Sequence, residues 1–201
     1  GLTTRDDMKR SSTFVSRHAS MNNLIRKRFG DGHPALGKGF WAYGDSVITV
    51  IECESEALVV LRFDGDSLRP HNMNWYQLQG TKASYISGRH DNEDPVIWME
   101  GLSSKNADGT ANQWDSLWKL SYKYEHPYWA ENMASARKLG HGGGDFFVLK
   151  DFADAILNKT RPFIDVYDAV AWSSIVPVSI ESVKKGGIPV DIPKFARRRR
   201  G

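Results

Sequence analysis

A glycine-rich segment around one imidazole is the part of this sequence best suited to chemistry. It reads Gly140-His-Gly-Gly-Gly-Asp-Phe and stands before the most regular apolar repeat of the chain. Small residues let the backbone approach a ligand, and helix N-termini attract anions and oxygen lone pairs. His141 could serve there as an acid, a base or a hydrogen-bond donor. A plain tight turn before a helix would use the same residues, so both interpretations stay open.

Three other segments carry side chains that could face a ligand. Tyr167 lies between two carboxylates in Asp165-Val-Tyr-Asp, although helix capping and the helix dipole account for both acids. Arg69-Pro-His71-Asn follows a predicted strand end, where ligand-facing groups commonly occur. Glu125-His126 offers a carboxylate and an imidazole, but a metal site needs further ligands at motif spacing. We therefore predict no metal site.

The remaining nucleophile patterns are absent from the sequence. No Gly-x-Ser-x-Gly elbow occurs, and the single cysteine, Cys53, lies in an apolar, strand-like run. One cysteine forms no internal disulfide, so we expect a buried, unreactive thiol. The glycine-rich segment is not a dinucleotide fingerprint, because no strand precedes it and no acid follows at about 20 residues. We predict no cofactor-binding residue in this chain.

Composition and charge exclude several classes of protein. The 201 residues are 40% hydrophobic, which suits one domain with a core. The net charge is +3, and Arg197–Arg200 contribute four positive charges, so the rest of the chain carries −1. A nucleic-acid partner is therefore not expected, although the tail could be a basic arm or a frayed end. No apolar run reaches the roughly 18 residues of a membrane span, and the compartment is left open.

Hydrophobic periodicity predicts strands first and helices afterwards. Asp145 is the expected N-cap of the strongest helix, Asp165 that of the next, and Pro177 is expected to break or kink that next helix. The predicted strands are Phe14–His18, Ser46–Cys53, Ala57–Phe63, Asn74–Leu78, Ala83–Ser87, Val96–Met99 and a short one at Val190. The predicted helices are Met21–Phe29, a short helix or irregular arm in Trp114–Tyr124, Trp129–Leu139, Asp145–Leu157, and one from Asp165 with a continuation over Ser179–Lys184.

This order of elements favours an α+β (α/β) fold. We expect an open-faced, largely antiparallel or mixed sheet with helices packed on one face. Because residues 1–12 are polar, we expect them to form a linker or disordered arm. We expect residues 13–196 to form one α/β domain and residues 197–201 to form a basic tail.

Several segments together resemble the C-terminal domain of Gfo/Idh/MocA-family oxidoreductases, closest to the branch of NAD-dependent α-N-acetylgalactosaminidases. The resemblance runs from about Phe14 to Phe195 and is most specific after His141. Its segments are Gln79-Gly-Thr-Lys, Tyr124-Glu-His-Pro-Tyr-Trp, His141-Gly-Gly-Gly-Asp-Phe, Asp165-Val-Tyr-Asp-Ala-Val-Ala-Trp-Ser-Ser, and Glu181-Ser-Val followed by Gly187-Ile-Pro-Val-Asp-Ile-Pro-Lys-Phe.

The resemblance implies the sugar-side half of a two-domain enzyme. An N-terminal Rossmann domain, absent from this chain, would hold NAD(P), while the C-terminal domain completes the sugar pocket and forms a homo-oligomer through its sheet face. In the glycosidase branch, a sugar hydroxyl at the third carbon is oxidised, which acidifies the neighbouring proton. Elimination then releases the aglycone, water adds and hydride returns. Other branches of the family are plain sugar or inositol dehydrogenases.

The resemblance assigns roles to four residues of this chain. Arg69 and His71 are expected to form part of the pocket wall, and His141 and Tyr167 to face the active site, with His141 the candidate for chemistry. The glycosidases have Arg-Pro-Tyr-Ser-Arg where this chain has Arg69-Pro-His71-Asn-Met. His71 could still hydrogen-bond a sugar, but this departure leaves the identity of the sugar open.

The sequence therefore supports one main hypothesis and one alternative. The main hypothesis is the substrate-binding and oligomerisation domain of an NAD(P)-dependent sugar oxidoreductase, in one version a redox glycosidase, and inactive without its cofactor half. The alternative is a stand-alone, non-catalytic module that binds sugar or assembles subunits. A nucleic-acid-binding domain would depend on the arginine tail alone.

Overall fold

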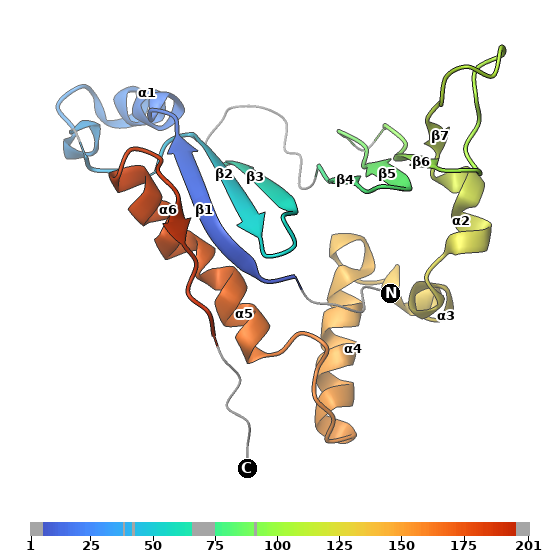
Figure 1. The fold of residues 1–201 in the computed structure, drawn as a ribbon. Helices are drawn as coiled ribbons and strands as arrows, with labels where there is room; N and C mark the ends of the chain where they lie inside the picture. The colour runs from blue at the N-terminus through green and yellow to red at the C-terminus, as the bar shows by residue number, and fades with distance from the viewer. Residues whose placement is uncertain (1–5, 38, 42, 66–74, 91, 196–201) are drawn as a thin grey trace. The chain divides into compact units, whose positions relative to one another are not determined.

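The computed structural model describes residues 6–195 except 38, 42, 66–74 and 91 (Figure 1). The chain divides into two compact units. One unit contains Gly1–Arg69 and Arg161–Gly201, and the other contains Pro70–Thr160. We describe each unit by itself.

The first unit is built on a four-stranded antiparallel sheet in the order β3-β2-β1-β8. Its β-branched and apolar runs suit a pleated, half-buried surface. The strands are β1 (Met8–Val15), β2 (Ser46–Cys53), β3 (Leu58–Asp64) and β8 (Val190–Asp191).

Helix α6 (Ile175–Lys184) packs on β1 and β8 and covers part of one face of this sheet (Figure 1), whereas Leu61 and Phe63 of β3 on that face stay exposed. The core beneath it consists of Ile51, Val178 and Ile192, each no more than 5% exposed. The buried Thr13 and Ser182 are paired here, since Ser182 Oγ accepts a hydrogen bond from the Thr13 backbone N–H at 3.0 Å. The unit also contains α1 (Ala19–Phe29), a short 3₁₀ turn η1 (Pro34–Leu36) and α5 (Val166–Ser173).

The other face of this sheet carries apolar side chains together with Glu52 and Arg62, and it has no covering element among the described residues of its unit. Strand register places Val50 opposite Val60 and Glu52 opposite Leu58, so these side chains share a face. Leu58 and Val60 are 68% and 64% exposed. We call the surface formed by Ile48, Val50, Leu58 and Val60 the open face.

The second unit contains a smaller antiparallel sheet in the order β4-β5-β6-β7, followed by helices. The three helices come in succession, and a 3₁₀ turn directly precedes the last of them. The elements are β4 (Gln77–Gln79), β5 (Ala83–Ile86), β6 (Val96–Met99), β7 (Asp115–Ser116), α2 (Trp118–Tyr124), α3 (Pro127–Ala136), η2 (His141–Gly143) and α4 (Gly144–Leu157).

The predicted fold class is confirmed: antiparallel strands come first and helices follow, in an α+β arrangement. The described strands form two sheets, each with its own helices, where one sheet was expected. Cys53 is buried as predicted, and burial raises the pKa of its thiol.

Three expectations about element boundaries are wrong. The linker predicted for residues 1–12 ends earlier, because β1 begins at Met8 and lies between β2 and β8. The N-cap of α4 is Gly143 rather than Asp145. Pro177 does not break a helix, because the break falls at Ser174 and Pro177 occupies the first turn of α6, where proline is tolerated.

Candidate functional site

The glycine-rich segment forms an unusual left-handed stretch between α3 and α4. His141, Gly142 and Gly143 have φ values of 53°, 64° and 95°, and the Gly143 N–H donates to the Gly140 carbonyl at 3.0 Å. Left-handed backbone is costly for most side chains but tolerated by His, Asn and Asp. We call Gly140–Gly144 the glycine loop.

Asp145 fixes one nitrogen of the His141 ring. The distance from His141 Nδ1 to Asp145 Oδ1 is 2.9 Å. Because an ionised carboxylate can only accept, Nδ1 is the donor and the lone pair of the neutral ring lies on Nε2. The His141 side chain is 68% exposed. Asp145 thus orients the imidazole instead of capping α4, and Nε2 is available to a ligand.

The glycine loop is held tightly against α3. A Cβ atom on Gly143 would lie 3.1 Å from both the Ala136 Cβ and the Trp129 Cη2, and Ala136 is fully buried. Gly143 is therefore required for close packing as well as for its positive φ. Gly142, in contrast, has open space around its Cα.

Aromatic rings join α3 to α4 behind the loop. The Phe147 ring lies 4.9 Å from Tyr128 and 5.4 Å from Trp129, measured between centroids. The Tyr128 hydroxyl donates to the Asp151 carboxylate, and this bond raises the pKa of Tyr128 to about 12. Packing of this kind explains why the first turn of α3 carries two aromatic residues.

His126 has a structural use in this arrangement. It is the N-cap residue of α3, and its Nδ1 accepts a hydrogen bond from the Tyr128 backbone N–H at 3.2 Å. No group of three or more His, Cys, Asp or Glu side chains that could hold a metal occurs in the described part of the chain.

Tyr167 is placed on α5 of the first unit by a complete capping box. The Asp165 carboxylate accepts from the backbone N–H groups of Tyr167 and Asp168, at 2.9 and 3.2 Å. Asp168 in turn accepts from the Asp165 N–H at 2.9 Å. The N-cap role predicted for Asp165 is confirmed, and Asp168, expected only to favour the helix dipole, completes a capping box. Tyr167 is half-buried and belongs to a different unit from His141. Arg69 and His71 lie outside the described residues.

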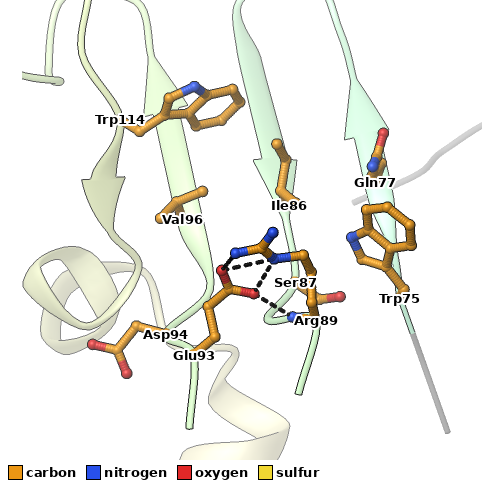
Figure 2. Close-up of a pocket in the computed structure, with 9 residues that line it drawn as sticks. All are labelled: Trp75, Gln77, Ile86, Ser87, Arg89, Glu93, Asp94, Val96 and Trp114. Carbon is orange, nitrogen blue, oxygen red and sulfur yellow. Dashed lines mark hydrogen bonds and ion pairs between the residues drawn. The ribbon is translucent and has the colours of Figure 1, made fainter. Parts of the chain in front are cut away.

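Sequence reasoning missed a pocket on the small sheet of the second unit (Figure 2). Its volume is about 360 Å³, and two tryptophans flank its floor. The only signal in the sequence was a tryptophan shortly before β4, Trp75, and another just before β7, Trp114. Strand pairing places both at the edges of one pocket. The lining residues are Trp75, Gln77, Ile86, Ser87, Arg89, Glu93, Asp94, Val96 and Trp114.

A nucleotide cofactor does not fit the described residues. Every strand pair among them is antiparallel, whereas a dinucleotide-binding fold needs parallel strands joined by a helix. The described helices include none long and apolar enough to cross a membrane.

The fold of this chain is similar to part of a solved enzyme, levoglucosan dehydrogenase. Levoglucosan dehydrogenase in complex with NADH and L-sorbose superposes with a TM-score of 0.65 at 18% identity, over 94% of this chain and 46% of that chain. The apo form of the same enzyme gives a TM-score of 0.66. At this level of identity the likeness shows the fold alone.

The sequence places the chain in a particular family. Residues 2–200 match the family described as "Glycosyl hydrolase 109, C-terminal domain", and the chain belongs to it. A glycosyl hydrolase family 109 protein of Stenotrophomonas maltophilia is 34% identical over 171 residues, which cover 85% of this chain and 35% of that protein. An alpha-N-acetylgalactosaminidase of Tannerella forsythia is 31% identical over 187 residues, 92% of this chain and 37% of that enzyme. The chain thus spans well under half the length of these relatives. The resemblance to this family that the sequence indicated is confirmed.

Proposed function

We propose that this chain is the sugar-side domain of an NAD-dependent redox glycosidase. The observation that carries the proposal is the glycine loop, which presents an imidazole oriented by a carboxylate, in a domain of glycosyl hydrolase family 109. The name of the Tannerella forsythia relative makes an α-linked N-acetylgalactosaminide the first glycoside to test.

His141 would be the residue of this domain nearest to the chemistry. Its Nε2 can accept a hydrogen bond from a sugar hydroxyl, or donate one when the ring is protonated. Asp145 would keep the ring in one tautomer while the sugar binds. Gly142 beside it has open space around its Cα and leaves room for a sugar to approach the backbone. Arg69 and His71 are proposed as groups of the pocket wall, and Tyr167 as a further residue that faces the active site.

The cofactor of this proposal would be held by residues outside this chain. NAD(H) supplies hydride acceptance and return when bound, and no residue described here fits that task. The part played by the present domain is to bind the sugar, orient it and exclude water. The alternative, a non-catalytic sugar-binding or assembly module, is favoured by the exclusively antiparallel strands of the described residues.

The open face is proposed as the contact between subunits. It presents four apolar side chains on adjacent strands, and such contiguous apolar surface usually marks an interaction site. A second copy of the same face would cover it symmetrically.

The test uses the intact polypeptide that contains this chain. It is denatured to release any bound NAD(H), and the native protein is assayed against a panel of nitrophenyl glycosides without added cofactor. Released nucleotide together with cleavage supports the proposal. Nucleotide without cleavage points to a dehydrogenase. If neither is found, the proposal fails and the non-catalytic module becomes the better account.

A further inference from the structure

The pocket on β4, β5 and β6 is separate from the glycine loop, with which it shares no lining residue (Figure 2). Its volume of about 360 Å³ is within the range of small-ligand sites. Nothing in the proposed reaction uses it.

The floor of the pocket is set by strand register. Gln77 pairs with Ile86, and Ile86 pairs with Val96, so the three side chains project from the same face of the sheet. Trp75 and Trp114 lie on opposite sides of this floor (Figure 2), and they are 52% and 49% exposed. Two large aromatic groups are thus left half in solvent around a concave surface, as they are in sites that bind a partly apolar ligand.

One end of the pocket is polar and rigid. The Glu93 carboxylate accepts from the Arg89 Nε at 2.8 Å and from the Arg89 backbone N–H at 2.7 Å. These bonds lower the pKa of Glu93 to about 2, so the carboxylate stays ionised at neutral pH. Ser87 Oγ is held in place by the Tyr76 backbone N–H at 2.8 Å. The polar groups are therefore positioned before any ligand arrives.

The charges at this end select among ligands. Arg89 is bound to Glu93. Asp94, which accepts from Trp118 Nε1 at 3.0 Å and points away from the floor (Figure 2), adds a second carboxylate at the edge, so the lining residues carry a net negative charge. A phosphate or carboxylate ligand would be repelled. A neutral polyol is not repelled, and its hydroxyl groups can donate to the carboxylates. Its C–H surfaces can lie against an indole face, which carries partial negative charge.

We infer that this pocket binds a neutral pyranose, stacked on Trp75 or Trp114 with its hydroxyl groups directed at Glu93 and Gln77. The inference extends the proposed function, because it gives the domain a second sugar site beside that of the glycine loop. Such a site would hold another sugar unit of a glycan substrate.

The experiment uses ¹⁹F NMR of the intact polypeptide labelled with 5-fluorotryptophan. The signals of Trp75 and Trp114 are assigned by their loss in W75F and W114F. N-acetylgalactosamine, galactose, N-acetylglucosamine and glucose are then titrated in turn. We expect both signals to shift and saturate with at least one of these sugars. In W75A or W114A, the affinity read from the remaining signal falls about tenfold.

The matched control is Trp172→Ala, which removes an indole of similar exposure, 56%, that does not line the pocket. This variant should bind the sugar as the unmodified protein does. The inference is overturned if neither signal responds to any of the sugars. If, in addition, W75A dissociates an oligomer in light scattering, the pocket is a subunit contact instead.

Nitrophenyl glycoside turnover is measured on the same preparation, so that the two proposals can fail separately. Turnover with silent tryptophan signals refutes the pyranose site and leaves the proposed function standing. Shifting signals without turnover or bound nucleotide support the pyranose site and refute the proposed function.

Discussion

At the scale of single residues, His141 combines an uncommon backbone conformation with a ring held by Asp145. His141→Asn tests the ring, because asparagine also tolerates left-handed backbone and the fold should persist. We expect kcat/KM of the intact polypeptide for its best glycoside to fall by about a hundredfold or more, the usual contribution of a proton-transferring group. The melting temperature should stay close to that of the unmodified protein. Unchanged kcat/KM would remove His141 from the chemistry.

The hydrogen bonds of the Asp115 carboxylate make the free energy of unfolding depend on pH. Its carboxylate accepts from the Ser104 backbone N–H at 2.9 Å and from Lys119 Nζ at 3.2 Å. The Ser104 bond is the largest cause that lowers the pKa of Asp115 from 3.8 to about 2. A lowered pKa means that the stabilisation is complete above pH 3.8 and is lost as the pH falls through about 2.

Asp115→Asn should therefore lower the free energy of unfolding at neutral pH and flatten its decline below pH 3.8. Urea unfolding followed at several pH values measures both effects. Asp31→Asn is the control, since the Asp31 side chain is 90% exposed. Parallel stability profiles for D115N and the unmodified protein would contradict the prediction.

At the scale of elements, the junction of α3 and α4 depends on Gly143. Gly143→Ala adds a Cβ 3.1 Å from Ala136 and Trp129 in a left-handed backbone, and we expect a loss of about 2–4 kcal/mol from strain and overpacking together. Gly142→Ala meets open space, so only the backbone cost of about 1 kcal/mol applies. Thermal unfolding compares the two variants. Equal losses would show that the contact with α3 does not matter.

Elements with local signals could be predicted from the sequence. The β2–β3 hairpin follows from two apolar runs around a short polar turn, and the capping box of α5 from two acids three residues apart. The predicted strand begins too late, at Phe14, because Lys9–Ser12 of β1 are polar. The buried Thr13 is tolerated because Thr49 and Ser182 pair with it, and no local pattern reveals these contacts across long stretches of chain.

The candidate site was predictable only in part. The glycine loop and His141 stand out by composition, but the left-handed turn makes Gly143 the cap and frees Asp145 for the imidazole. The pocket of Figure 2 was missed because Trp75 and Trp114 are far apart in sequence, and only strand pairing places them on two sides of one pocket floor.

At the scale of the whole molecule, the open face should determine the association of subunits. Val60→Lys places a charge at its centre, where Val60 is 64% exposed, and should weaken the oligomer without unfolding the chain. Asn158→Lys, at the exposed C-cap of α4, is the charge-matched control. Multi-angle light scattering of the intact polypeptide gives the mass. A monomeric unmodified protein, or an oligomer unaffected by V60K, would exclude this face as the interface.

The most direct test of the redox glycosidase is the fate of one hydrogen of the sugar. Oxidation at the third carbon acidifies the proton on the second carbon, and elimination followed by hydration replaces that proton from solvent. The intact polypeptide is therefore allowed to cleave its best nitrophenyl glycoside in D₂O, and the released sugar is examined by NMR and mass spectrometry. Our account predicts one deuterium on the second carbon. Cleavage that leaves only hydrogen on this carbon would contradict our account. It would indicate a glycosidase that hydrolyses the bond by direct displacement.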